Sequence, residues 1–398
     1  MDNHPDTLTQ TPNAERLHIV IFGRRNVGKS SLINAITGQQ VAITSDTPGT
    51  TTDPVNKAME IYPLGPCLLT DTAGYDDTGE LGALRNKRTQ QAIAQAHLAL
   101  IVIDQEPQDL DQAWMDALKS HHIPYLVVLN KSDLLDAAQI AAIEKKTGAK
   151  IIAVSALKHE GIEALRLKMA SLLPHDEARS ITGSLAQAGD VVLLVMPQDQ
   201  QAPKGRLILP QVQTIRDLLD KNCTVVSATA QGLPSALNAL SKPPRLIIAD
   251  SQVFGQVYAQ KPAESLLTSF SVLMAAYKGD IAYMVQSAKR IDQLHKRSKI
   301  LIAEACTHAP LSEDIGREKI PALLKKRYGV SDVTVTSGKD FPDDLSAYDL
   351  VIHCGACMFT RRLMLARTRQ AIEQQVPMTN YGLAIAHLKG ILDKVVIP

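Results

Sequence analysis

Short apolar runs alternate along the chain with longer segments whose apolar residues recur at helical spacing. Five runs in the first part end in polar or glycine-bearing residues, as buried parallel strands do: 18–23, 67–74, 98–104, 124–130 and 149–155. The pattern predicts an α/β domain with a parallel-type sheet over residues 17–174, after a polar tail at residues 1–16.

Two further α/β series follow. The first predicts a domain over residues 175–262, with strands at 189–197, 223–228 and 245–251. The second predicts a domain over residues 263–398, starting with a helix through Met274 and continuing with strands at 299–305, 333–338 and 349–354. The alternative of two larger domains stays open, because sequence does not show which sheets merge.

Composition narrows the classes of protein. The chain has 398 residues, 45% of them hydrophobic, and no run approaches the roughly 18 apolar residues of a membrane span. A net charge of +1 argues against a broad surface for nucleic acid or anionic lipid. The polar start lacks a signal-peptide pattern, so we expect a cytoplasmic protein. The short apolar runs and the near-zero charge lead us to expect no membrane and no nucleic acid as partners. In that reducing compartment, five cysteines are not expected to form a disulfide framework.

A glycine-bearing loop follows the first predicted strand. Residues 23–30, Gly-Arg-Arg-Asn-Val-Gly-Lys-Ser, precede a helical segment, which is the spacing of a phosphate-binding P-loop. Lys29 is then expected to reach the β- and γ-phosphates, and Ser30 to bind Mg²⁺. An ordinary glycine turn is the alternative for this motif taken alone.

Three more polar motifs end predicted strands, and they favour a guanine nucleotide. Asp71-Thr72-Ala73-Gly74 places a carboxylate near Mg²⁺ and a glycine N–H near the γ-phosphate. The carboxylate of Asp133, in Asn130-Lys131-Ser132-Asp133, can accept hydrogen bonds from guanine N1–H and the exocyclic amine, a donor pair that adenine lacks. Ser155-Ala156 suits a backbone contact to guanine O6. The four motifs together predict a GTPase.

Residues 17–173 resemble the TrmE and Era group of GTPases. The resemblance implies that Asn26 helps to bind a potassium ion. It also implies that Thr51 is the switch ligand of Mg²⁺, with the neighbouring Thr50 as the alternative. Tyr75 follows the Asp71–Gly74 motif in place of a water-orienting Gln, so intrinsic hydrolysis should be slow. Lys29, Thr51 and Asn26 are the expected catalytic residues. The expected nucleotide contacts are Gly23, Asn26, Val27, Gly28, Lys29, Ser30, Ser31, Thr51, Asp71, Gly74, Asn130, Lys131, Asp133, Ser155 and Ala156.

Cysteine and histidine residues follow two strands of the third series. Cys306-Thr307-His308 comes after the strand at 299–305, and His353-Cys354-Gly355-Ala356-Cys357 ends and follows the strand at 349–354. Carboxyl ends of strands are where open α/β sheets place ligands, so the groups converge if the two strands are neighbours. Thiolates suit an iron–sulfur cluster, but a zinc site, a redox dithiol and buried cysteines stay open. Cys67 and Cys223 are predicted to be core cysteines.

The combination of a GTPase domain with these cysteines resembles the HydF family of [FeFe]-hydrogenase maturation GTPases. The resemblance extends to GTTTDPV at 49–55, KAME at 57–60, PLGP at 63–66 and DTAGYDDTGELG at 71–82. It implies a middle dimerisation domain and a [4Fe-4S] cluster on Cys306, Cys354 and Cys357, with an open or weakly bound fourth iron site for which His308 and His353 are candidates.

The function implied by the resemblance is a scaffold that hydrolyses GTP and carries a diiron precursor to apo-hydrogenase. The implied cofactors are GTP, Mg²⁺, the [4Fe-4S] cluster and K⁺. The implied partners are apo [FeFe]-hydrogenase, the radical-SAM maturases HydE and HydG, and further copies of the chain. Basic residues at Lys289-Arg290, Lys296-Arg297 and 361–367 are expected near the cluster, as solvated faces or as a docking surface. The alternative function is an RNA- or ribosome-associated GTPase with structural zinc.

Overall fold

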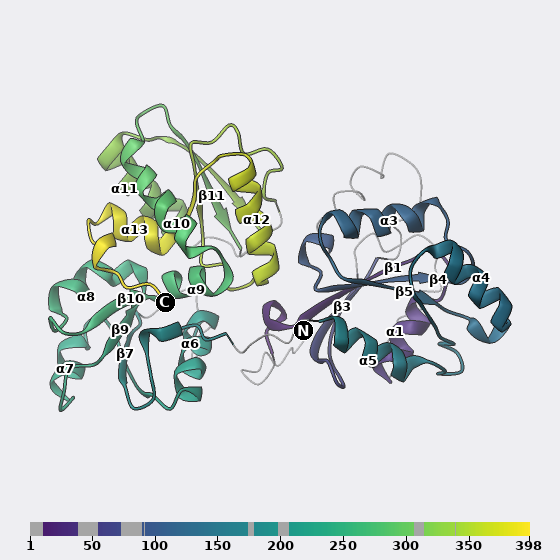
Figure 1. Cartoon of the computed structure of the whole chain (residues 1–398). Helices are drawn as coiled ribbons and strands as arrows, with labels where there is room; N and C mark the ends of the chain where they lie inside the picture. The colour runs from purple at the N-terminus through teal and green to yellow at the C-terminus, as the bar shows by residue number, and fades with distance from the viewer. Residues whose placement is uncertain are drawn as a thin grey trace, which may run out of the picture. The chain divides into compact units, whose positions relative to one another are not determined.

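A computed structural model describes residues 11–38, 55–72, 90, 92–173, 179–197, 207–305, 314–338 and 340–398. The chain divides into two compact units, Met1–Asp176 and Glu177–Pro398 (Figure 1). The second and third α/β series share the second unit, which is one of the arrangements that the sequence left open.

The first unit is built on a six-stranded sheet of order β2-β3-β1-β4-β5-β6, in which only β2 is antiparallel to its neighbour. Its strands are β1 (Leu17–Phe22), β2 (Val55–Ile61), β3 (Gly65–Asp71), β4 (Leu98–Ile103), β5 (Tyr125–Leu129) and β6 (Ile151–Ala153). Its helices are α1 (Lys29–Thr37), α3 (Asp109–Ser120), α4 (Ala137–Thr147) and α5 (Ile162–Leu172).

Helices cover both faces of this sheet, which explains why its central strands are apolar throughout. Successive residues of β1 point to opposite faces: Ile19 and Ile21 pack with α1 and α5, whereas Val20 and Phe22 pack with α3. Figure 1 shows α3 on one side of the sheet and α1 with α5 on the other. The parallel strands therefore bring the loops after β1, β3, β5 and β6 to one edge, as the sequence predicted.

Strand β2 lies at the edge of the sheet and was not predicted. Its residues 56–60 are alternately exposed and half-buried, because only one face meets the protein. The alternation of apolar and polar residues in this segment is too weak to predict a strand from the sequence.

The second unit contains two four-stranded parallel sheets, β10-β9-β7-β8 and β12-β11-β13-β14. The first has strands β7 (Val191–Val195), β8 (Thr224–Ala228), β9 (Leu246–Ala249) and β10 (Leu266–Ser269), with helices α6 (Leu209–Asp220), α7 (Leu233–Asn238), α8 (Phe254–Gln260) and α9 (Phe270–Lys278). The second has strands β11 (Lys299–Glu304), β12 (Asp332–Ser337), β13 (Leu350–His353) and β14 (Met378–Asn380), with helices α10 (Ile281–Ala288), α11 (Ile320–Tyr328), α12 (Arg361–Glu373) and α13 (Tyr381–Leu388).

Helix α9 joins the two sheets of this unit. Its residues Phe270, Leu273 and Met274 pack in the core of the β10-β9-β7-β8 sheet, and the helix also contacts α12, α13 and β14. Because β10 pairs with β9, the β10-β9-β7-β8 sheet includes residues beyond 262, where the sequence predicted a domain boundary.

No helix among the described residues is long and apolar enough to cross a membrane.

Candidate functional site

The P-loop connects β1 to α1 and depends on two glycines. A Cβ at Gly23 would lie 2.6 Å from the Val102 carbonyl oxygen, so the strand end leaves no room for a side chain. Gly28 has a φ of 90° at the N-cap of α1, and a Cβ there would collide with the amide of Asn130. These contacts explain the glycines at both positions and place the start of α1 where its N–H groups can face a phosphate.

Lys29 lies inside this loop. Its side chain is buried, and Nζ donates to the carbonyl oxygens of Gly23 (2.5 Å) and Arg24 (3.0 Å). The ammonium group is thereby held within the turn that would surround a β-phosphate. Ser30 and Ser31 follow in the first turn of α1.

Asn130 ties the P-loop to the loops after β5 and β6, which the sequence predicts to bind the base. Its Nδ2 donates to the carbonyl of Val27 (2.9 Å), and its Oδ1 accepts the N–H of Ala156 (3.1 Å). The side chain is 2% exposed, so both bonds are shielded from water. One amide thus fixes three of the predicted motifs relative to one another.

Two acidic residues that the sequence analysis did not select support the same loops. Lys131 Nζ donates to the Asn26 carbonyl (2.8 Å) and to Asp104 (2.7 Å). Arg24 Nε donates to the fully buried Asp111 (3.1 Å). Asp104 could have been selected from the sequence, because it is the polar residue that ends the predicted strand at 98–104. Nothing in the sequence distinguishes Asp111 from other helix residues.

Asp133, the expected guanine-specificity residue, lies beside Ser155 and Lys158. A hydrogen bond from the Ser155 side chain, aided by Lys158 at 3.4 Å, holds the pKa of Asp133 below its usual value. An ionised carboxylate is the form that accepts two hydrogen bonds from a guanine edge.

Asp71 ends β3 opposite Ile21 of β1, which places it next to the start of the P-loop. Thr72 continues this contact, because its hydroxyl donates to the Ile21 carbonyl (2.7 Å). The expected site residues Thr51 and Gly74, together with Tyr75, lie outside the described residues.

The cysteine loop, residues 354–359, follows β13. Strands β11 and β13 are parallel neighbours, so the segment that leads to Cys306 and the loop that carries Cys354 leave the same sheet edge. Cys306 and His308 themselves lie outside the described residues. Within the described ranges, no group of three or more His, Cys, Asp or Glu side chains could hold a metal ion.

The surroundings of Cys354 fit a thiolate ligand of an iron–sulfur cluster. Its Sγ accepts the N–H groups of Ala305 (3.0 Å) and Ala356 (3.4 Å), the kind of bond that stabilises cluster sulfurs. In the metal-free protein, burial raises the pKa of this thiol to about 12. Cys357 is half-buried in the same turn. By contrast, Cys67 and Cys223 are buried in separate cores, as predicted.

His353 is a structural residue rather than a free ligand. Its Nδ1 donates to the Cys354 carbonyl (3.0 Å), so Nε2 is the acceptor for the Arg367 guanidinium (2.8 Å). Burial, together with that guanidinium, lowers the pKa of His353 to about 3. Both ring nitrogens are used, and the expectation that His353 could be the fourth ligand is not supported by this geometry.

Arg367 is also buried, contrary to the expectation of a solvated or docking side chain. Its guanidinium bonds the carbonyl of Gly338 (2.8 Å) and lies between the rings of Phe341 and Phe359, 4.5 and 4.6 Å from their centroids. The residue therefore packs the base of the cysteine loop.

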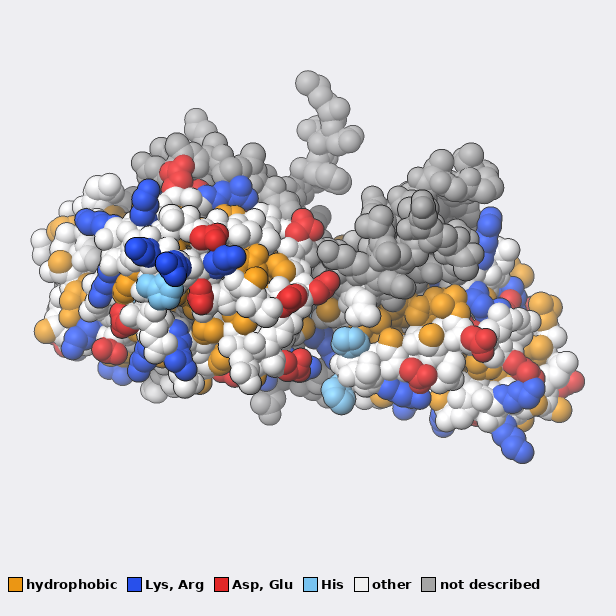
Figure 2. Space-filling model, turned by 90° about the horizontal axis from the view of Figure 1, so that it is seen from above, with side chains coloured by type: hydrophobic (Ala, Val, Ile, Leu, Met, Phe, Trp, Pro, Cys, Tyr) orange, Lys and Arg blue, Asp and Glu red, His pale blue; other side chains and the backbone are white. Residues whose placement is uncertain are grey.

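The expectation that Lys289-Arg290 and Lys296-Arg297 lie near the cysteines is wrong. Lys296-Arg297 lie just before β11, separated from it by Ser298, whereas Cys354 directly follows the parallel strand β13. They therefore lie at opposite ends of the parallel strands, about 20 Å apart. Asp292 lies in the same segment as Lys289-Arg290 and accepts a hydrogen bond from Tyr328, which precedes β12. This segment therefore also lies at the end of the sheet where the strands begin, away from the cysteine loop. Figure 2 shows Lys and Arg side chains gathered on one face of this unit.

Arg367→Leu is expected to lower the free energy of unfolding by about 3 kcal/mol, because the substitution leaves His353 Nε2 and the Gly338 carbonyl buried without a donor. Urea unfolding of the metal-free protein measures this loss. Arg216→Leu is the control, since Arg216 makes an exposed helical ion pair with Asp220. Equal stability of the two variants would contradict the structural role of Arg367.

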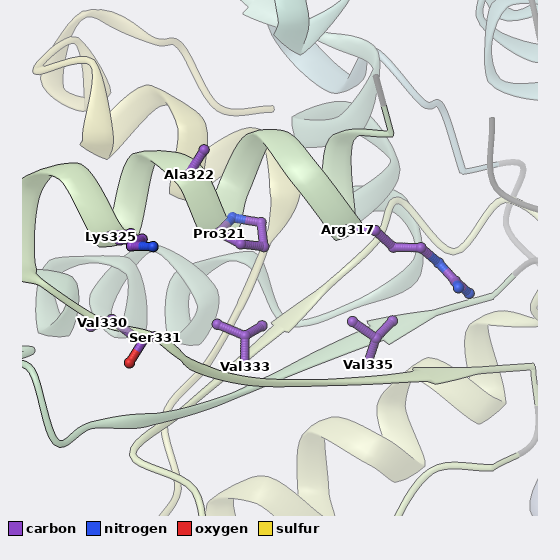
Figure 3. Close-up of a pocket in the computed structure, with 8 residues that line it drawn as sticks. All are labelled: Arg317, Pro321, Ala322, Lys325, Val330, Ser331, Val333 and Val335. Carbon is purple, nitrogen blue, oxygen red and sulfur yellow. The ribbon is translucent and has the colours of Figure 1, made fainter. Parts of the chain in front are cut away.

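A shallow groove of about 290 Å³ lies between α11 and the edge strand β12 (Figure 3). Val333 and Val335 point from the strand toward Pro321 and the helix. Arg317 lies at one end, where it pairs with Glu304 (2.9 Å). The groove is lined by apolar and basic side chains and contains no cysteine.

Comparison with family models decides the relationship. Residues 181–279 match the hydrogen maturase F dimerization domain, and residues 282–398 match the hydrogen maturase F tetramerization domain. The chain belongs to the hydrogen maturase F (HydF) family. Residues 18–131 match the 50S ribosome-binding GTPase model, so the first unit of this HydF-family chain is a P-loop GTPase domain. The two domain models support a homo-oligomer.

Individual relatives match part of the chain. The tRNA modification GTPase MnmE of Nitrosomonas europaea is 40% identical over 155 residues, covering 38% of this chain and 34% of that protein. MnmE of Moorella thermoacetica is 30% identical over 260 residues, or 64% and 50% of the two chains. The HydF-family chain thus spans about a third to a half of these relatives.

Solved structures give weaker matches. A crystal structure of Aquifex aeolicus Era bound to GDP and AlF4⁻ aligns with a TM-score of 0.36 and 20% identity, covering 56% of this chain and 98% of that one. Methanococcus maripaludis SelB with a GTP analogue gives a TM-score of 0.33 and 22% identity, covering 42% and 35%. The family assignment rests on the sequence matches.

Proposed function

We propose that this chain is a [FeFe]-hydrogenase maturation GTPase, a scaffold that holds a [4Fe-4S] cluster and delivers a diiron precursor to apo-hydrogenase. The observation that carries the proposal is the pair of hydrogen maturase F domains over residues 181–398, which contain the cysteine loop. The cluster would be held by Cys354, Cys357 and Cys306, and it would supply an iron site for an exchangeable ligand.

The nucleotide half of the proposal rests on the four loops at one edge of the first sheet. GTP would bind with its phosphates at Lys29 and its base at Asp133. Mg²⁺ would be held by Ser30 and Thr51, with Asp71 beside it. K⁺ would bind near Asn26, whose carbonyl accepts from Lys131.

The metal half rests on the chemistry of the cysteine loop. Cys354 receives two backbone N–H groups, and the segment that leads to Cys306 leaves the neighbouring strand at the same edge. Soft thiolates in this setting suit iron and sulfide. The partners we propose are apo-hydrogenase, HydE and HydG, in the cytoplasm.

Purification without oxygen, followed by iron, zinc and sulfide analysis and EPR after dithionite reduction, tests the cluster. We expect about four iron and four sulfide per chain. Stoichiometric zinc without iron, even after reconstitution, would reject the cluster and favour the alternative of an RNA- or ribosome-associated GTPase with structural zinc. Filter binding of RNA to the same sample then tests that alternative, and the proposal expects no binding.

Coupling of the two sites is a separate part of the proposal. Lys29→Ala is expected to abolish GTP hydrolysis and, with it, activation of apo-hydrogenase by protein that carries the diiron precursor. Unchanged activation and unchanged maturase binding in the absence of hydrolysis would reject the coupling while leaving the scaffold role intact.

A further inference from the structure

One buried lysine holds the cysteine loop from outside it. Lys278 is the last residue of α9 and is 1% exposed. Its Nζ donates to three loop carbonyls, those of Phe359 (2.8 Å), Cys357 (3.1 Å) and Ala356 (3.4 Å). An ammonium has three protons, so it can donate to all three of these carbonyls.

The loop needs such a partner to keep its shape. Ala356 has a positive φ of 54°, which is costly for a residue with a Cβ, and the Phe359 N–H closes the turn on the Ala356 carbonyl (3.0 Å). The turn directs the carbonyls of Ala356, Cys357 and Phe359 toward one point. A buried carbonyl left without a donor there, such as that of Phe359, would cost about 1–3 kcal/mol.

Lys278 comes from the dimerization domain, whereas the loop belongs to the tetramerization domain. The N-terminal end of α9 is also bonded to the tetramerization domain, because Asn380 Nδ2 donates to the Ser271 carbonyl (2.8 Å) and hydroxyl (2.9 Å). The helix therefore has little freedom to shift without moving the loop.

The charge of Lys278 acts on the same loop. Its ammonium is bonded to the backbone of a cysteine proposed as a cluster ligand, in an interior where charges interact more strongly than in water. A nearby cation stabilises the reduced, more negative form of a cluster, and so raises its reduction potential.

We propose that Lys278 is a positioning residue, which fixes the cysteine loop from the dimerization domain and raises the reduction potential of the cluster that the loop holds. This inference rests on the proposed function. It also assigns α9 a role as the mechanical link between the oligomerisation layer and the metal site.

The test compares Lys278→Met with Lys261→Met. Lys261 is a matched control because its Nζ also donates to three carbonyls, those of Pro262 (2.9 Å), Ala263 (3.3 Å) and Ser265 (2.7 Å), in a loop without cysteine. Hydrogen exchange of the metal-free full chain measures opening of the cysteine loop, residues 354–359. Redox titration of the reconstituted protein, followed by EPR, measures the potential.

Lys278→Met is expected to speed exchange in the loop by about 10-fold and to make the potential more negative, whereas Lys261→Met changes neither. Exchange or potential equal to that of the unmodified chain would overturn the proposal. If Lys278→Met does not fold, Lys278→Gln, which removes the charge but keeps a donor, must show the same negative shift. If the unmodified chain binds no cluster, the proposed function fails, and loop exchange alone decides the role of Lys278.

Discussion

Asp133→Asn is expected to weaken GTP binding by about 10⁴-fold, because the substitution replaces an acceptor of two hydrogen bonds with a group that presents an N–H to guanine. The carboxylate is set up for this task, since Ser155 and Lys158 keep its pKa low. Xanthosine triphosphate carries a carbonyl where guanine carries its amine. The variant should therefore bind that nucleotide better than GTP.

Titration with fluorescent GTP and xanthosine triphosphate, together with hydrolysis rates for both, checks this exchange of specificity. Asp136→Asn is the matched control, because Asp136 caps α4 through the Gln139 N–H (2.8 Å) and Asn caps helices equally well. An Asp133→Asn variant that keeps the original affinity for GTP would show that the base is recognised elsewhere.

Cys354→Ala is expected to remove the iron–sulfur cluster, reducing iron from about four per chain to background. A three-cysteine site that loses one thiolate cannot be completed by His353, whose two nitrogens already bond the Cys354 carbonyl and Arg367. Hydrogenase activation should be lost with the cluster, while GTP hydrolysis should persist because it belongs to the first unit.

Iron and sulfide analysis of oxygen-free preparations measures this loss. Cys223→Ala provides the control, since Cys223 is buried in the core of the other sheet of the same unit and its thiol donates to the Gln187 carbonyl (3.2 Å). The control should keep its iron. A Cys354→Ala variant with full iron content would mean that the cluster lies elsewhere.

The sequence predicted strands such as β4 and β7 because their apolar runs are continuous and end abruptly. It missed β10 and β14, for one physical reason. Each runs directly into a helix without a loop, so the strand and the helix read as one apolar segment. Only the N-caps separate them: Ser269 accepts the N–H of Val272, and Asn380 accepts the N–H of Leu383.

The nucleotide motifs could be located from sequence because each is short and lies at a strand end. Their supports could not, because Asp111 reaches Arg24 across 87 residues and nothing local marks the pair. The burial of Arg367 could not be predicted from the sequence either, because a basic residue in a helical segment is usually exposed to solvent. Its burial depends on Phe341 and Phe359, whose approach is decided by the tertiary fold.

The last residues of the chain return to the start of the second unit. The Val396 N–H donates to the Leu267 carbonyl (2.9 Å), and a Cβ at Gly183 would lie 2.9 Å from the Cβ of Pro398. Residues 183 and 398 are therefore spatial neighbours, although 215 positions separate them. A short linker between these two points, with new termini opened in an exposed loop, should give a circular permutant of residues 183–398 that keeps both sheets of the second unit intact.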